Sequence, residues 1–203
     1  MQGVGTIFAY VIVTHMFNHI RRKIMKLCGL DFETANAAPG SICAAGAAVI
    51  ENGIVAERRE YLIKPHKSVD YMSGVCSNIH GICYEDLRES PEFPEIWSSL
   101  KNVLTTADCV IIHNAPFDLR HLQAVLQLYS LPQVQFNYAC SVRLCRHHFP
   151  LEQHHDLAHM AELFGITFQH HDALEDAETC VKIASQLEIP ENFISRFEYS
   201  ADV

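Results

Sequence analysis

The stretch Leu30–Asn36, LDFETAN, places two acidic residues at the end of an apolar run that begins at Leu27. Residues of a strand alternate between its two faces, so Asp31 and Glu33 are expected on one face, less than ~7 Å apart at a rise of ~3.3 Å per residue. Two carboxylates this close repel each other, and burying them costs free energy unless a cation lies nearby. A frayed strand end with both acids in water is the alternative, but the residues around them are typical of a core.

Two further acids interrupt the apolar stripes of predicted helices. Asp118 follows HNAPF and lies on the apolar face of the helix predicted over 116–130, and Asp176 does the same in the helix predicted over 172–187. A capping box explains Asp172 and Glu175 but not Asp176. For Asp118, attraction to the helix dipole is an alternative. Four inward-facing carboxylates predict an oxygen-only site for two Mg²⁺ or Mn²⁺ ions that stabilise a phosphodiester displacement.

The order of the predicted elements indicates one α/β domain over 26–190, with a C-terminal tail at 191–203. An antiparallel meander is expected first, turning at Asn52-Gly53, and crossover helices then complete a mixed sheet. We expect a loop over 65–87. Strands are predicted over 26–32, within 41–65, over 108–113 and near 136–140; helices are predicted over 90–106, 116–130, 141–149, 155–166 and 172–187.

The net charge and the positions of the cysteines exclude some classes of protein. The 203-residue chain carries a formal net charge of −9, which argues against a protein that coats a phosphate backbone with basic residues. It leaves room for an enzyme that holds one strand end beside metal cations. The eight cysteines form no C-x-x-C pair and lie mostly in apolar runs. They therefore predict reduced, buried thiols and a cytoplasmic protein.

The first 25 residues carry an apolar run followed by HIRRKIMK, the reverse of the order in a secretory signal. The run is short for a helix that spans a membrane, which needs ~20 apolar residues. An extension outside the domain is the favoured interpretation. A partner-binding amphipathic helix and a membrane anchor are the alternatives.

Three motifs resemble, in order, those of the DEDDh 3′-5′ exonucleases, a family that includes the proofreading epsilon subunit of bacterial DNA polymerase III and ribonuclease T. They are LDFET (30–34), HNAPFD (113–118) and HDALEDA (171–177), and the resemblance runs from about residue 26 to 187. It implies a ribonuclease H-like fold with a mixed five-stranded sheet flanked by helices. It also implies metal ligation by Asp31, Glu33, Asp118 and Asp176, with His171 as the general base. The neighbouring His170 is the competing base and is expected to face solvent.

The same resemblance implies contacts to the terminal nucleotide. Backbone around Phe32 and Thr34 would meet the 3′-hydroxyl, and His80 and Ile82 would contact the base or sugar. The second motif would be shaped by Asn114 and Phe117, the latter as easily core as substrate platform. We interpret His155 as structural support; a zinc site that pairs it with His159 is an alternative, disfavoured because no cysteine or carboxylate has matching spacing.

The function implied is a metal-dependent exonuclease that releases nucleoside 5′-monophosphates from single-stranded 3′ ends. DNA is preferred as substrate, with proofreading or repair as the setting, and an exoribonuclease that trims RNA or short oligonucleotides is the alternative. A polymerase accessory or binding module is the alternative of another class. The sequence supports a polymerase partner only through QLEIP (186–190), which faintly resembles a clamp-binding peptide. No membrane partner is expected.

Overall fold

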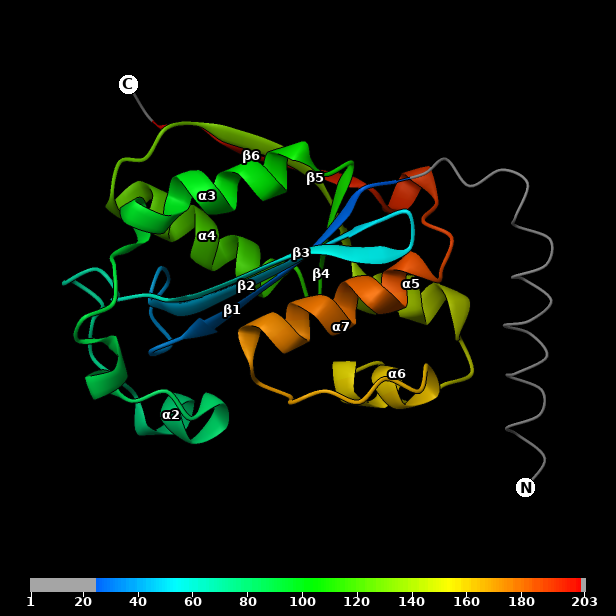
Figure 1. Cartoon of the computed structure of the whole chain (residues 1–203), viewed down its shortest axis with the longest axis horizontal. Coiled ribbons are helices and arrows are strands. Elements are labelled where there is room, and N and C mark those ends of the chain that lie inside the picture. The colour runs from blue at the N-terminus through cyan, green and yellow to red at the C-terminus, as the bar shows by residue number, and fades with distance from the viewer. Residues whose placement is uncertain (1–24, 202–203) are drawn as a thin grey trace.

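A mixed sheet of six strands lies between two layers of helices in the computed structural model, which describes residues 25–201. The strand order is β3-β2-β1-β4-β5-β6 (Figure 1). Strand β4 runs parallel to β1 and β5, and the other neighbours are antiparallel. The strands are β1 (Leu27–Thr34), β2 (Ile42–Glu51), β3 (Ile54–Leu62), β4 (Cys109–Ile112), β5 (Val134–Cys140) and β6 (Ser195–Tyr199).

The predicted meander is confirmed. Asn52 and Gly53 join β2 to β3 with φ angles of 56° and 78°, the left-handed pair that a two-residue hairpin turn requires. Strand β2 is rich in alanine and buried along nearly its whole length, because helices cover the sheet on both faces. The meander places β1 beside β4, so the acids of β1 lie near the centre of the sheet.

Alternation along β1 divides the core into two parts. Cys28, Leu30 and Phe32 pack in the cluster of α3 (Phe93–Thr106) and α4 (Pro116–Leu128). Leu27 packs on the other side with α5 (Ser141–His148), α6 (Leu157–Leu163) and α7 (Ala173–Ser185). These two layers lie above and below the sheet in Figure 1. Asp31 and Glu33 therefore share the face that α7 covers.

The sheet has one strand more than the five expected. Strand β6 forms within the stretch assigned to a tail, because Phe197 and Tyr199 add buried side chains to the core and the Phe197 ring stacks 5.0 Å from that of Phe136. The loop expected over 65–87 is also wrong in part: it contains α2 (Gly74–His80) and a 3-10 turn at Tyr84–Leu87. Helix α2 has no buried residue, which removes the apolar periodicity that predicts a helix.

The expectations for the N-terminal extension fall on residues that are outside the described range, apart from Met25. Within residues 25–201, no helix is both long and apolar enough to cross a membrane. All eight cysteines are free thiols, and six of them are buried, so they contribute to packing.

Candidate active site

Three of the four predicted metal ligands meet at one point. Asp31 and Glu33 extend from β1 and Asp176 from the first turn of α7, and each offers an oxygen within 4.8 Å of the others. Asp172 starts α7 by accepting hydrogen bonds from the N–H groups of Leu174 and Glu175 at 3.1 and 3.0 Å. This cap fixes where the helix begins, and so where Asp176 lies.

Two glycines allow α7 to approach the sheet this closely. A Cβ atom at Gly46 of β2 would lie 2.0 Å from the carbonyl oxygen of Ala173, and one at Gly29 of β1 would lie 2.0 Å from that of Ala177. Any larger residue would push the helix away. The first turn of α7 therefore sits on the sheet because these two strand positions have no side chain.

Asp118 occupies the first turn of α4 and is 2 % exposed. Its Oδ1 accepts a hydrogen bond of 3.1 Å from the backbone N–H of Phe32, which links α4 to β1 between the two other acids. It lies beside the group of three and not within it. Burial and this bond show that more than the helix dipole holds Asp118 in place.

Burial raises the pKa of each of these acids. It raises the pKa of Asp31 well above its usual range, with further contributions from Asp118 and Asp176, and it raises that of Asp118 as well. The pKa of Glu33 reaches about 8 and that of Asp176 about 6, each again mainly through burial. The ionised site is therefore costly by itself, and a bound cation would reverse this.

The donor set fits a divalent metal ion. Oδ2 of Asp176 accepts a hydrogen bond from the His171 N–H at 3.1 Å, whereas its Oδ1 is buried and has no hydrogen-bond partner among the described residues. A buried carboxylate oxygen without a hydrogen-bond partner costs free energy, which a bound ligand would offset. Carboxylate oxygens from Asp31, Glu33 and Asp176 are ligands that Mg²⁺ and Mn²⁺ prefer.

Two adjacent histidines border the carboxylates. His171 has a φ of 67°, a left-handed conformation that costs free energy for a residue other than glycine and that its bond to Asp176 helps to hold. Its ring centroid is 3.9 Å from that of His170. Both offer a ring nitrogen within 4.8 Å of an Asp176 oxygen. His170 is exposed to solvent, as predicted, and it also lies close to Asp176.

His80 secures the segment that contains α2. Its Nδ1 accepts a hydrogen bond from the N–H of Ile82 at 3.1 Å, so Nε2 carries the proton and donates to the carbonyl of Thr34 at 3.2 Å. Burial lowers the pKa of His80, in keeping with a neutral ring. Both ring nitrogens are thus occupied, and His80 holds α2 against the end of β1.

The other predicted contact residues have different surroundings. The Phe32 side chain is buried in the core, which leaves only its backbone near the site. Phe117 is 43 % exposed and packs its ring 4.7 Å from that of His121, so it is not a core residue. Asn114 is exposed and left-handed, with a φ of 59°.

The histidines considered for zinc have separate partners. Nε2 of His155 donates to the carbonyl of Phe149 at 3.0 Å, which matches its interpretation as structural support. His159 pairs with Glu152 at 3.0 Å. Among residues 25–201, neither belongs to a group of three potential ligands.

Comparisons with known proteins agree with this geometry. The DNA polymerase III subunit epsilon of Buchnera aphidicola subsp. Baizongia pistaciae is 27 % identical over 197 residues, covering 90 % of this chain and 77 % of the relative. The PolC-type DNA polymerase III of Thermotoga petrophila is 27 % identical over 157 residues, covering 76 % of this chain. The chain spans 11 % of that polymerase, so the similarity concerns one part of a much longer protein.

Solved structures share the fold. Exonuclease X in complex with 5′-overhanging duplex DNA has a TM-score of 0.62 at 20 % identity, covering 78 % of this chain and 88 % of that one. The nuclease domain of 3′hExo, a DEDDh family member bound to rAMP, has a TM-score of 0.67 at 18 % identity, covering 83 % and 98 %. The model of the exonuclease family RNase_T matches residues 28–184, which span all three motifs. The chain therefore belongs to the RNase T/DEDDh exonuclease family, enzymes that hydrolyse phosphodiester bonds and depend on divalent metals.

Proposed function

We propose that this exonuclease removes nucleotides one at a time from single-stranded DNA 3′ ends, using two Mg²⁺ or Mn²⁺ ions held by Asp31, Glu33, Asp118 and Asp176. The observation that carries the proposal is the group of three carboxylates, from Asp31, Glu33 and Asp176, that meets at the end of β1. Its raised pKa values and the partnerless oxygen of Asp176 indicate a site built for cations. The released product would be a nucleoside 5′-monophosphate.

The protein residues have distinct roles in this mechanism. Bound cations would supply positive charge to stabilise the attacking and leaving oxygens of the displacement. His171 lies at the exposed edge of the carboxylates, where it can accept a proton from the attacking water. The Asp176–His171 hydrogen bond holds the histidine backbone in its left-handed conformation. Backbone near Thr34 would receive the strand end. The exposed Phe117 ring, and Ile82 within the segment that His80 secures, would be available to the base or sugar.

The names of the relatives support DNA more than RNA. Both sequence relatives described above belong to DNA polymerases, which also makes a polymerase a candidate partner. RNA is the second candidate substrate, since the nuclease domain of 3′hExo is bound to rAMP and covers 83 % of this chain. Discrimination would depend on contacts to the 2′-hydroxyl.

A direct assay compares single-stranded DNA and RNA of the same base sequence, each labelled at its 5′ end. With Mn²⁺ or Mg²⁺ the wild type should shorten DNA stepwise from the 3′ end, and EDTA should stop the reaction. Asp31→Asn should be inactive, while Glu162→Gln on the exposed side of α6 should be normal. Faster shortening of RNA would reverse the substrate assignment. A metal-loaded protein that is inert on both strands would refute the proposed function.

A further inference from the structure

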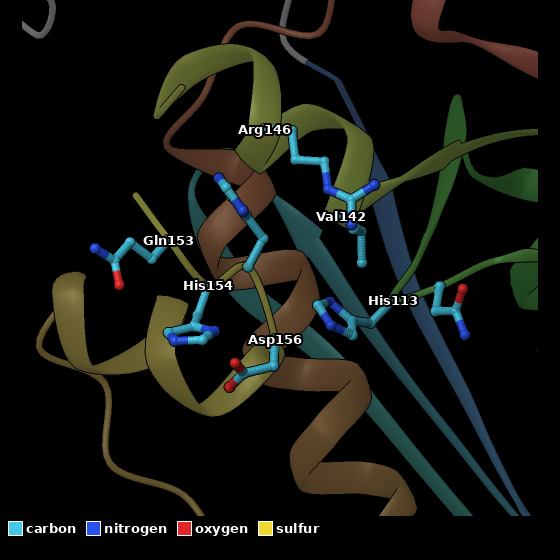
Figure 2. A pocket seen from close by; sticks show the side chains of 8 residues that line it. His113, Val142, Arg146, Gln153, His154 and Asp156 are labelled. Carbon is cyan, nitrogen blue, oxygen red and sulfur yellow. The ribbon is translucent and has the colours of Figure 1, made fainter. Parts of the chain in front are cut away.

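A cavity of about 390 Å³ opens between the end of β4, helix α5 and the start of α6, and it has no role in the chemistry described so far. Its walls include His113 and Asn114 from the end of β4, Arg146 from α5, and Gln153, His154 and Asp156 from the segment that enters α6. Figure 2 shows the Arg146 guanidinium extending toward His113, with His154 and Asp156 on the opposite wall. The size is within the range of ligand pockets.

The cavity is linked to the active site through His113, which is close enough to His170, a neighbour of Asp176, for their charges to interact. Asn114 begins the turn into α4 and lies four residues before Asp118. Nδ1 of His113 is 2.8 Å from Oγ of the buried Ser141, which fixes the ring at the cavity wall. Burial lowers the pKa of His113 to about 4, so this ring is uncharged at neutral pH. Arg146 is therefore the fixed positive charge of the wall.

Arg146 is available to an anion. Its guanidinium makes no ion pair and no hydrogen bond with any of residues 25–201. Arg143, on the same helix, lies 5.3 Å from the ring centroid of Phe193. Asp156 is the one carboxylate of the cavity, and its Oδ1 accepts a hydrogen bond from the His159 N–H at the start of α6.

The opposite side of the site, at helix α2, exposes apolar side chains and lacks lysine and arginine. Helix α2 lies across from α5 and α6, with the start of α7 between them (Figure 1). Residues 71–84 contain no lysine or arginine, and Tyr71, Val75 and Ile79 are exposed there. A 3′-terminal nucleotide has a single phosphate, the scissile one, so its sugar and base need an apolar surface and no cation. The strand before it carries one phosphate per nucleotide.

We infer that this cavity receives a phosphate of the nucleotide immediately upstream of the scissile bond, with the Arg146 guanidinium as its charged donor and the side-chain amides of Asn114 and Gln153 as neutral ones. The inference rests on the proposed function and adds the path of the strand: from the cavity, across the carboxylates, to α2. It also explains how a chain with a net charge of −9 binds a polyanion, because the positive charge is placed at one phosphate and not spread over a face.

The test uses Arg146→Gln, Arg146→Lys and the control Arg143→Gln, which changes the same charge on the same helix outside the cavity. Two substrates are compared: a single-stranded hexanucleotide, and the p-nitrophenyl ester of a nucleoside 5′-monophosphate, which has the reacting phosphate but nothing upstream. Both are prepared in deoxyribose and ribose forms. Steady-state kinetics are measured between 50 and 200 mM salt, and thermal unfolding verifies that each variant is folded.

We expect Arg146→Gln to raise KM for the hexanucleotide about 5- to 10-fold, as loss of one charged phosphate contact should. The slope of log(kcat/KM) against log[salt] should become shallower by about 0.7, the value per phosphate for single strands. Hydrolysis of the p-nitrophenyl ester should stay within twofold of wild type, and Arg146→Lys should recover part of the loss. An effect no larger than that of Arg143→Gln, or an equal loss on the ester, would overturn the inference. If the wild type hydrolyses neither substrate, the proposed function fails with it.

Discussion

Replacing Asp176 by asparagine should stabilise the metal-free protein, although it removes a proposed metal ligand. Burial raises the pKa of this carboxyl from 3.8 to about 6 in the fold. The folded state thus binds the proton more tightly than the unfolded chain does. Stability is therefore lost as the pH rises from about 4 to above 6. A difference of about two pK units corresponds to about 3 kcal/mol at neutral pH, and the side chain is only 5 % exposed, so solvent screening is small.

The gain from Asp176→Asn should therefore depend on pH. We expect an increase in the free energy of unfolding of up to about 3 kcal/mol at pH 8, and about half of that at pH 5, where the wild-type carboxyl is already mostly protonated. For a domain of this size, 3 kcal/mol corresponds to a rise in Tm of roughly 6–12 °C. Asparagine keeps an oxygen that can accept the His171 N–H, so this contact should survive.

Urea unfolding in EDTA at pH 5 and pH 8 measures the effect, with Glu162→Gln on the exposed side of α6 as the control. Added Mg²⁺ should stabilise the wild type and shrink or reverse the advantage of the variant, because the metal binds the ionised folded state. A loss of stability that is equal at pH 5 and pH 8 would refute the reasoning. It would mean that Asp176 stabilises the fold through its hydrogen bond, and that its ionised carboxylate does not destabilise the metal-free protein.

Three other changes test the positioning of the site. Gly46→Ala should cost roughly 1–3 kcal/mol and most of the activity because its Cβ would meet the first turn of α7 at 2.0 Å, whereas Gly74→Ala, with open space around it, should change stability little, as urea titration will show. His171→Ala should lower kcat by about 10²–10⁴ with Mn²⁺ affinity retained; if His170→Ala has the larger effect, the base has been assigned to the wrong histidine. His80→Gln should raise KM several-fold with kcat nearly unchanged and speed hydrogen exchange across residues 74–82, because it loosens α2; an unchanged exchange rate would contradict that role.

The sequence alone predicts the features of the fold and the site that depend on residues close together in the chain. The Asn-Gly turn predicts the hairpin, and the alternation along β1 predicts that Asp31 and Glu33 share a face. Asp176 stands out in the sequence because it interrupts an apolar stripe and because helix capping does not explain it. These features depend on neighbours a few residues away, so a single sequence contains them.

What could not be predicted depends on distant contacts. Helix α2 buries none of its residues and is held by a hydrogen bond from His80 to the carbonyl of Thr34 at the end of β1, which leaves no periodic pattern. Strand β6 is identified only through the core surface that β5 presents to it. The closeness of His170 to Asp176 follows from the left-handed turn at His171, a conformation that the residue type does not favour. The adjacent pair of histidines is the one feature of the sequence that indicates this closeness.

The carboxylate site and the proposed role of the cavity would together explain how an acidic chain can act on a nucleic acid. Basic proteins that neutralise many phosphates gain affinity along the whole strand and lose it steeply with salt. Here the carboxylates Asp31, Glu33 and Asp176 would repel the strand until cations bind, and only then would they hold the scissile phosphate. Metal binding and substrate binding would therefore be coupled at that one phosphate. With Arg146 as the proposed second anchor, two neighbouring phosphates would fix the register of the strand, and the longer stretch upstream would remain free of the protein, as suits an enzyme that acts on strand ends.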